Sequence, residues 1–481
     1  MKRFSVAAWS AFTLTLAGLG CGDSSAAPIV PTQIVLTTSA GGTVNGAAFA
    51  TQPVAVIRDK AGTTAATTTS AVAMTVSAGA TVVGTSVAMA VAGVATFSGV
   101  GIRGTPGTSY TLTFASGSLT SATQSVTVPV TFTALKAGSV HTCGLTSAGA
   151  AYCWGGNSQG TLGDGTSTGR VTPVAVQGGL VFATLTAGSF HNCGLTSAGA
   201  AFCWGSNIHG ELGDATTTDR LTPTAVQGGL VFSALAAGAF STCGLTRAGA
   251  AYCWGFNTDG ELGDGTATQR LTPVPVEGGF LFTALMTGDY HGCGLTSAGA
   301  AYCWGFVDAG GVGDGTSIDR HTPVAVLGGL VFTALTGGGF HTCGLTTAGV
   351  TYCWGSNALG ELGDGTTTKR TTPVPVLGGF VFTALTAGNI HVCALTSAGA
   401  AYCWGSNGEG QLGDPVSTLR LAPVAVRGEI LFTAATAGGR HTCALTSAGT
   451  AYCWGGNTSG QLGDGTTTNR SSPVADRKSV V

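Results

Sequence analysis

The triplet Cys-Trp-Gly recurs every fifty residues, and this period constrains the fold more than any other feature. The copies begin at Cys153, Cys203, Cys253, Cys303, Cys353, Cys403 and Cys453, with no insertion or deletion between them. A constant period of this length is typical of repeat architectures, in which each copy is one structural unit and neighbouring copies bury a shared core. Seven units therefore occupy residues 130–475.

Each unit predicts four short strands. In one unit these are "FTALTAG" from Phe382, "HVCALT" from His391, "AAYCWG" from Ala400, and a short "VAV" segment before a Gly-Gly turn. Segments of this length, bounded by glycine and proline, are typical of strands. Glycine supplies 80 of the 481 residues, and each interior glycine costs a helix about 1 kcal/mol. We therefore predict an all-β fold, a seven-bladed β-propeller of four-stranded sheets around a central channel.

The two cysteines of each unit fit a β-hairpin. If Ser147-Ala148-Gly149 form a three-residue loop with glycine in the left-handed conformation, Cys143 faces Cys153. Opposed strand residues lie within the range of a disulfide. This register predicts seven bridges, one in each unit: Cys143–Cys153, Cys193–Cys203, Cys243–Cys253, Cys293–Cys303, Cys343–Cys353, Cys393–Cys403 and Cys443–Cys453.

A histidine two residues before the first cysteine raises zinc binding as an alternative. It occurs in six units, and the third unit carries Ser241 instead; the histidines are His141, His191, His291, His341, His391 and His441. One histidine and two cysteines are fewer than the four ligands of a structural zinc site. The structural interpretation is favoured, and no metal or cofactor is expected.

Residues 1–21 have the features of a bacterial secretory signal. Lys2 and Arg3 precede an apolar stretch that ends close to Cys21. The segment resembles a lipoprotein signal, which implies lipidation of Cys21, although Gly18 stands where such signals usually carry leucine; a plain cleaved signal is the alternative. Fourteen of the fifteen cysteines fall in the repeats, so lipidation also accounts for the remaining one. We predict an exported protein, lipid-anchored at the cell envelope, where disulfides persist.

Residues 31–129 differ in composition from the repeats. Residues 22–30, which precede them, are expected to be a linker. The segment contains no cysteine or tryptophan, and "QPVAVIRD" from Gln52, "GVATFSGV" from Gly93 and "YTLTFASG" from Tyr110 alternate as strands do. This pattern predicts an immunoglobulin-like β-sandwich. It resembles the bacterial immunoglobulin-like repeats of invasin and intimin, which implies a spacer.

The repeat carries a recognisable set of short motifs. Gly188-Ser189-Phe190-His191, Trp204-Gly205-Ser206-Asn207 and Gly210-Glu211-Leu212-Gly213 resemble the repeat of the regulator of chromosome condensation family. The resemblance implies a seven-bladed propeller. Nucleotide exchange on a small GTPase, known in that family, depends on an inserted wedge and a basic surface. This chain has neither, so exchange activity is the least favoured function.

Composition also restricts the partners. The formal net charge is −2 and charged residues make up only 8%, so no basic stripe exists to neutralise nucleic-acid phosphates. An exported bacterial propeller of this broad kind binds and inhibits β-lactamase, which implies binding of another protein. We therefore expect a monomer that binds an unknown protein, or alternatively a glycan, at the cell envelope.

Comparison of the seven units separates constant from variable loops. The Ser-Ala-Gly turn is nearly constant, whereas the first-to-second and third-to-fourth strand loops vary and should share one face. The variable positions predict binding through Phe256, Phe306, Tyr290, Asp289, His209 and Arg440. Two alternatives remain open: drift in unconstrained loops, and packing of the aromatic column at 190, 240, 290 and 340 between blades.

Catalysis is not expected, because nearly every histidine, aspartate and arginine recurs by symmetry, as scaffold residues do. The alternative is a lectin or an enzyme acting on polysaccharide through Asp289, Tyr290, Asp308 and His321. The recurring pair exemplified by Asp164 and Arg170 is interpreted as fixing a loop, with calcium binding as the second interpretation.

The last six residues, Asp476 to Val481, replace the expected "VxGG" by "DRKSVV". We hypothesise that residues 476–481 are an artefact of gene assembly, and we predict that the ring is then incompletely closed.

Overall fold

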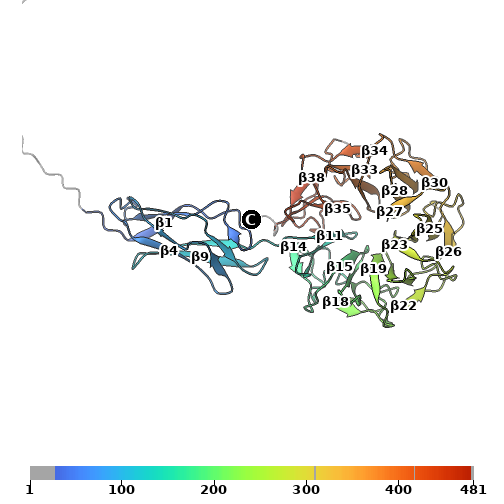
Figure 1. Ribbon diagram of the computed structural model, residues 1–481, viewed down its shortest axis with the longest axis horizontal. Helices are drawn as coiled ribbons and strands as arrows, with labels where there is room; N and C mark the ends of the chain where they lie inside the picture. Colours follow the sequence, from blue (N-terminus) through green and yellow to red (C-terminus); the bar gives the residue numbers. More distant parts are fainter. Residues whose placement is uncertain (1–27, 308–309, 417, 478–481) are drawn as a thin grey trace, which may run out of the picture.

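A computed structural model describes residues 28–307, 310–416 and 418–477. Every regular element within these ranges is a β-strand, and the strands form two bodies, an N-terminal sandwich and a ring (Figure 1). No helix in these ranges is long and apolar enough to cross a membrane. Cys21, the signal and most of the linker lie outside the described residues, so those predictions stay predictions.

The N-terminal body contains ten strands in three sheets. The strands are β1 (Gln33–Thr38), β2 (Ala47–Ala48), β3 (Val54–Arg58), β4 (Ala71–Val76), β5 (Thr81–Val83), β6 (Val87–Met89), β7 (Val94–Thr96), β8 (Gly101–Arg103), β9 (Ser109–Ala115) and β10 (Ala122–Thr127). They pair in the orders β1-β3-β7, β10-β9-β4-β6 and β2-β8-β5. Alternate residues of β9 point into one core, where Phe97 and Phe114 meet edge to face at 5.5 Å. The bacterial immunoglobulin-like assignment remains a prediction.

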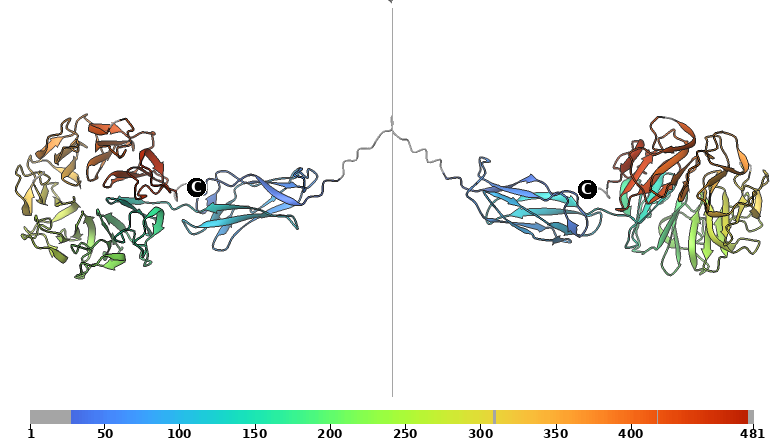
Figure 2. Two further views of the ribbon diagram at one scale, coloured as in Figure 1. Left: turned by 180° about the vertical axis from the view of Figure 1, so that it is seen from behind. Right: turned by 45° about the horizontal axis from the view of Figure 1, so that its top comes forward.

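The ring contains seven four-stranded antiparallel sheets, which confirms the predicted seven-bladed propeller (Figures 1 and 2). Blade 1 contains β11 (Ala134–Ala137), β12 (His141–Leu145), β13 (Ala151–Gly155) and β14 (Arg170–Ala175); blade 2, β15 (Thr184–Ala187), β16 (His191–Leu195), β17 (Ala201–Gly205) and β18 (Arg220–Ala225); blade 3, β19 (Phe232–Ala237), β20 (Ser241–Thr246), β21 (Ala251–Gly255) and β22 (Arg270–Pro275); blade 4, β23 (Phe282–Thr287), β24 (His291–Thr296), β25 (Ala301–Gly305) and β26 (Arg320–Ala325).

The remaining blades repeat this pattern. Blade 5 contains β27 (Phe332–Gly337), β28 (His341–Thr346), β29 (Thr351–Gly355) and β30 (Arg370–Pro375); blade 6, β31 (Ala384–Ala387), β32 (His391–Leu395), β33 (Ala401–Ser406) and β34 (Leu419–Ala425); blade 7, β35 (Ala434–Ala437), β36 (His441–Leu445), β37 (Ala451–Gly455) and β38 (Arg470–Ala475). The first strand of each blade lies nearest the ring centre and the fourth lies at the rim (Figure 1).

The hairpin register is confirmed. Cys143 pairs with Cys153, and the Thr146 amide donates to the Ala150 carbonyl across the predicted loop. Gly149 adopts a φ of 77°, the left-handed conformation that the loop requires. All seven disulfides form, each with its Cα atoms 4.1 Å apart.

The core lies between blades and is built on these disulfides. Phe182 and Trp204 of blade 2 pack against Cys143 and Cys153 of blade 1. The Trp204 indole is fully buried, and its Nε1–H donates to the Thr161 carbonyl of blade 1 at 3.1 Å. Buried indoles usually find such an acceptor, and the same bond recurs at Trp254, Trp304, Trp354 and Trp404, whereas Nε1 of Trp154 and Trp454 has no partner among the described residues. Each blade thus completes the core of the one before it.

The ring is closed, so the prediction of incomplete closure is wrong. Phe132 and Trp154 of blade 1 pack on the disulfide of blade 7 as Phe182 and Trp204 pack on that of blade 1. Closure does not depend on the unusual tail, because each blade takes all four strands from its own unit. The Asp476 and Arg477 amides donate to Ala451 and Gly463, the bonds that residues 176 and 177 make in blade 1. Residues 478–481 lie outside the described residues.

Five of the six recurring histidines form hydrogen bonds to the adjacent blade, whereas the ring nitrogens of His341 have no hydrogen-bond partner among the described residues. His191 Nε2 of blade 2 lies 2.8 Å from the Thr242 hydroxyl of blade 3, and His441 of blade 7 lies equally close to Thr142 of blade 1. Each ring fits because a glycine lies beside it: a Cβ at Gly138 would sit 2.1 Å from His141 Cε1. The structural interpretation of these histidines therefore agrees with their contacts.

Candidate binding face

The two variable loops of each blade lie on the same face. In blade 1 the Gly156 amide, which begins the third-to-fourth strand loop, donates to the Val140 carbonyl in the first-to-second strand loop at 2.8 Å. The constant turn lies at the other end of the strands, where the Phe182 amide of the interblade connection donates to Gly149. We call these the variable face and the constant face.

Seven rings on the variable face form a chain of contacts that we call the aromatic arc. Its members are Phe190, His209, Phe240, Phe256, Tyr290, Phe306 and Phe340. Phe190 stacks on Phe240 with 5.6 Å between ring centroids, and Tyr290 stacks on Phe340 at 5.2 Å. Phe240 and Tyr290 lie 6.3 Å apart and join the two halves. The arc therefore runs without interruption across blades 2, 3, 4 and 5.

Four predicted binding residues belong to this arc. His209 contacts Phe256 at 4.9 Å, and Phe306 lies 6.4 Å from Tyr290. The rings are partly exposed, and Phe340 keeps 41% of its surface accessible. The aromatic column thus packs across blade boundaries, as one alternative held, but it does so at loop tips rather than inside the core. An exposed run of aromatic surface is characteristic of interaction sites.

Asp289 lies beside the arc but is already engaged. One carboxylate oxygen accepts a hydrogen bond from the Ser189 hydroxyl at 3.0 Å, and the other accepts from the Asn389 side-chain amide at 2.9 Å. These residues come from blades 2, 4 and 6, so the Asp289 side chain reaches across the mouth of the channel. Burial raises the pKa of Asp289. Its evident role is to tie three loops together.

Arg440 lies in a different part of the variable face. It forms an ion pair with Glu409 at 2.8 Å, and its side chain is 64% exposed. With Val140, Ile390 and Glu409 it lines a cavity of about 450 Å³ that includes loops of blades 6, 7 and 1. The structure therefore separates the predicted residues into an aromatic region and a polar one.

The candidate catalytic group is not assembled. His321 lies on the outermost strand of blade 4, with Nδ1 3.0 Å from the Thr266 carbonyl, whereas Asp289 lies at the channel mouth. Asp308 is outside the described residues. Asp289 and His321, which were expected to converge on a polysaccharide, are thus divided between opposite edges of one blade.

The Asp-Arg pair fixes its loop, as predicted. Asp164 Oδ2 accepts from Arg170 Nε at 3.0 Å, while Oδ1 accepts from Asn157, from the Thr166 amide and from the Thr166 hydroxyl. Burial alone would raise the pKa of Asp164, but these hydrogen bonds together lower it. An equivalent ion pair occurs in every blade. The carboxylate is committed to the loop, which disfavours the calcium interpretation.

Glu261, a buried carboxyl group beneath the arc, was not predicted as a notable residue from the sequence. In blade 2, Glu211 accepts a hydrogen bond from the Ser206 hydroxyl at 2.9 Å. Blade 3 has Phe256 at the serine position, and Oε1 of the equivalent Glu261 has no hydrogen-bond partner among the described residues. Burial raises the pKa of Glu261 to about 7. Because phenylalanine has no hydroxyl group, Phe256 cannot supply the hydrogen bond that Ser206 supplies in blade 2. A comparison of these positions between the two units would have indicated that Glu261 lacks this partner.

The architecture defines a class: disulfide-bridged β-propellers whose blades are single contiguous repeats. A model of the regulator of chromosome condensation (RCC1) repeat matches residues 132–161, 182–211, 232–261, 382–411 and 432–461. A second model of that repeat matches residues 198–245, 248–295, 348–395, 398–445 and 448–476. Together they cover more than half of the chain, and the chain belongs to the regulator of chromosome condensation repeat family.

Solved structures show the same fold at low identity. Prp20p from Saccharomyces cerevisiae superposes with a TM-score of 0.63 at 22% identity, over 69% of this chain and 87% of that one. Yeast RCC1 (Prp20) bound to Kap60 gives 0.61 at 21%, over 68% and 83%. Human WBSCR16 gives 0.60 at 20%, over 68% and 90%. No curated protein sequence matches this chain.

Proposed function

We propose that this protein is an exported, lipid-anchored protein of the bacterial cell envelope that binds a protein partner through the aromatic arc. The arc carries the proposal. Aromatic side chains, Phe and Tyr included, bury much surface and are enriched in the cores of protein–protein interfaces. Here they form one continuous, partly exposed row across four neighbouring blades.

The point where the chain enters the ring agrees with this proposal. The N-terminal body joins blade 1 at Val130 to Phe132, and the Phe132 amide donates to Gly449 in the constant turn of blade 7. The chain therefore enters the ring on the constant face. Figure 1 shows the N-terminal body beside the rim of the ring, so an anchor at Cys21 would leave the variable face free for a partner.

The structures with the same fold support binding as the general activity. One shows yeast RCC1 bound to Kap60, and another is described with its binding to Gsp1p and histones. These partners belong to those proteins. What transfers to the proposal is recognition of a protein by a propeller of this repeat, rather than catalysis.

Replacing Phe256 and Phe306 together by alanine is expected to reduce partner capture at least ten-fold. The double variant removes two of the seven rings of the arc, one from blade 3 and one from blade 4, but leaves every disulfide and interblade tryptophan intact. The matched control is Phe280→Ala with Phe380→Ala, because these rings lie on the interblade connections of the constant face, against Tyr302 and Tyr402. Envelope proteins captured by each immobilised propeller are compared by quantitative mass spectrometry.

A protein that the native and control propellers enrich, and that the Phe256/Phe306 variant loses, supports the proposal. Equal capture by both variants contradicts it. A glycan array probed with the same three proteins is the second arm. Loss of a specific glycan signal in the arc variant, without loss of any protein, would replace the protein partner by a lectin function.

Anchoring is tested separately at Cys21. The variant Cys21→Ala should move the protein from the membrane fraction to the soluble fraction, because one residue carries the proposed lipid. The mass of the mature native protein should correspond to a chain that begins at Cys21 and carries acyl groups. A native protein found in the soluble fraction without added acyl mass would refute the anchor while leaving the binding proposal intact.

A further inference from the structure

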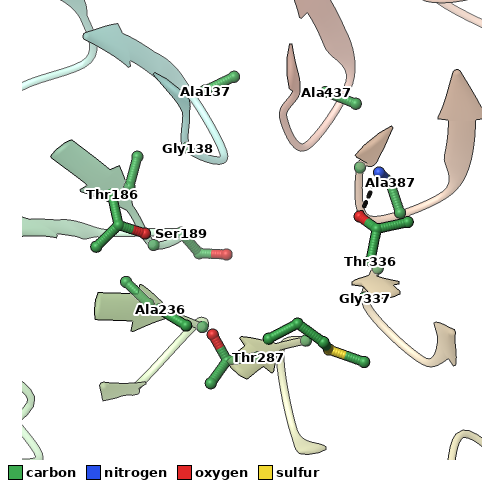
Figure 3. Close-up of a pocket in the computed structure, with 18 of the residues that line it drawn as sticks. Ala137, Gly138, Thr186, Ser189, Ala236, Thr287, Thr336, Gly337, Ala387 and Ala437 are labelled. Atoms are coloured by element: carbon green, nitrogen blue, oxygen red, sulfur yellow. Dashed lines mark hydrogen bonds between the residues drawn. The ribbon is translucent and has the colours of Figure 1, made fainter. Parts of the chain in front are cut away.

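The innermost strands place one side chain from each blade at the same level of the channel. This layer consists of Lys136, Thr186, Ala236, Met286, Thr336, Thr386 and Thr436, which line a central cavity of about 250 Å³. Figure 3 shows Thr186 and Thr336 on opposite sides of this space, with Ala236 between them along one wall. The layer is asymmetric, because polar groups and apolar groups occupy separate arcs of the circle.

The threonines can donate hydrogen bonds into the cavity. Thr336 Oγ1 accepts from the Ala387 amide at 2.9 Å, Thr386 Oγ1 accepts from Ala437 at 3.0 Å, and Thr436 Oγ1 accepts from Ala137 at 3.1 Å. Figure 3 shows the first of these bonds. Each hydroxyl oxygen is held by a backbone donor, and its own proton remains available to an acceptor.

Lys136 adds a positive charge beside these hydroxyls. It follows Thr436 around the ring, so Lys136, Thr436, Thr386 and Thr336 come from four consecutive blades. No carboxylate lies within ion-pair distance of Lys136 among the described residues. Asp289 is the one acidic residue among the described residues that line this cavity, and its oxygens accept from Ser189 and Asn389.

The surrounding protein lowers the pKa of Lys136 by desolvation, although its side chain remains accessible to solvent within the channel. An anion small enough to enter the channel would pair with this ammonium group, which has no carboxylate within ion-pair distance among the described residues.

We propose that the channel binds a small monocarboxylate, with its oxygens held by Lys136 and the threonine hydroxyls and its short apolar part against Ala236 and Met286. One cation and several neutral donors match a single negative charge. The cavity volume of about 250 Å³ is sufficient for a ligand of a few heavy atoms. This site is independent of the aromatic arc.

Calorimetric titration of the intact, oxidised protein with butyrate tests this proposal. One butyrate per chain is expected to bind, and Lys136→Met should weaken binding at least ten-fold, because the ammonium is lost while a side chain of similar length remains. Thr386→Val should weaken it several-fold. The matched control is Lys60→Met, since Lys60 is an exposed lysine of the N-terminal body and should leave binding unchanged. Thermal unfolding of each variant verifies that the ring is intact.

Three outcomes overturn the proposal: no heat of binding with the native protein, equal affinity in folded Lys136→Met, or inorganic phosphate binding more tightly than butyrate. The last result would show an oxyanion site without the apolar contribution from Met286. The Phe256/Phe306 variant should bind butyrate normally, so failure here and failure of the proposed partner binding are distinguishable.

Discussion

Reduction of the seven disulfides is expected to unfold the ring at temperatures at which the oxidised protein is folded. Each bridge joins cysteines ten positions apart. Closing a loop of that size raises the free energy of the unfolded state by roughly 2–3 kcal/mol. Seven such terms together amount to about 14–21 kcal/mol, which is comparable to or larger than the roughly 5–15 kcal/mol by which typical domains are stable. Circular dichroism during heating, with and without a phosphine reductant, measures the difference, and a thiol count verifies complete reduction.

A reduced protein with fourteen free thiols and an unchanged melting temperature would contradict this expectation. The double variant Cys243→Ala with Cys253→Ala removes one bridge from the middle of the array. It should lower the free energy of unfolding by the contribution of a single bridge, which is a fraction of the effect of reducing all seven. The other six bridges lie within their own blades. The remaining blades should therefore keep their conformation in this variant, which serves as the control.

Acidification is expected to unfold the ring steeply between about pH 6 and pH 4. Burial lowers the pKa of His141 and His291 to about 4, and that of the other four recurring histidines to about 3: His191, His341, His391 and His441. The same histidines titrate near 6.5 when unfolded. Below that value the unfolded chain binds more protons, so stability falls as the pH falls towards the folded values.

The loss of folding stability per pH unit depends on the number of buried histidines. Each histidine lowers the free energy of unfolding by about 1.4 kcal/mol per pH unit in this window. Six histidines therefore lower it by up to about 8 kcal/mol per unit. The carboxyl groups whose pKa values are lowered act in the same direction at lower pH; they are those of Asp164, Asp214, Asp264, Asp314, Asp364 and Asp464. Glu261, whose pKa is raised to about 7, acts in the opposite direction, and so do Glu211, Glu361, Asp259 and Asp289, whose pKa values burial also raises.

Blade 3 supplies the natural control for this prediction, because it carries Ser241 where other blades have histidine. The variant His191→Ser should reduce proton uptake on unfolding by about one proton per chain and shift the acid midpoint downward. Denaturant unfolding followed by tryptophan fluorescence at a series of pH values measures this dependence. A flat stability profile from pH 7 to pH 4 would exclude the buried, neutral state of these histidines.

The fold was predictable because the sequence states it seven times. Period, turn residues and cysteine spacing independently gave the hairpin register, in which Cys143 faces Cys153. The loop pair of Asp164 and Arg170 was equally accessible, because a charge pair repeated at fixed spacing has a structural explanation.

The site was less predictable, because it depends on contacts between blades that the repeat pattern does not describe. Variable columns identified Phe256 and Phe306 as members of one surface. They could not show that the carboxylate of Asp289 is occupied by residues one hundred positions away on either side. Lys136 was overlooked because it lies in a strand, although comparison with threonine, alanine and methionine at the same position would have revealed it.

The self-contained blades have a further consequence for how this molecule can be rearranged. Many closed rings need strands from both chain ends within one sheet, but here no strand of the ring is exchanged between blades. The gap between blades 7 and 1 carries the same packing as the other interblade junctions. The position of the break is therefore arbitrary, and a circular permutant that begins at any interblade connection would assemble the same ring.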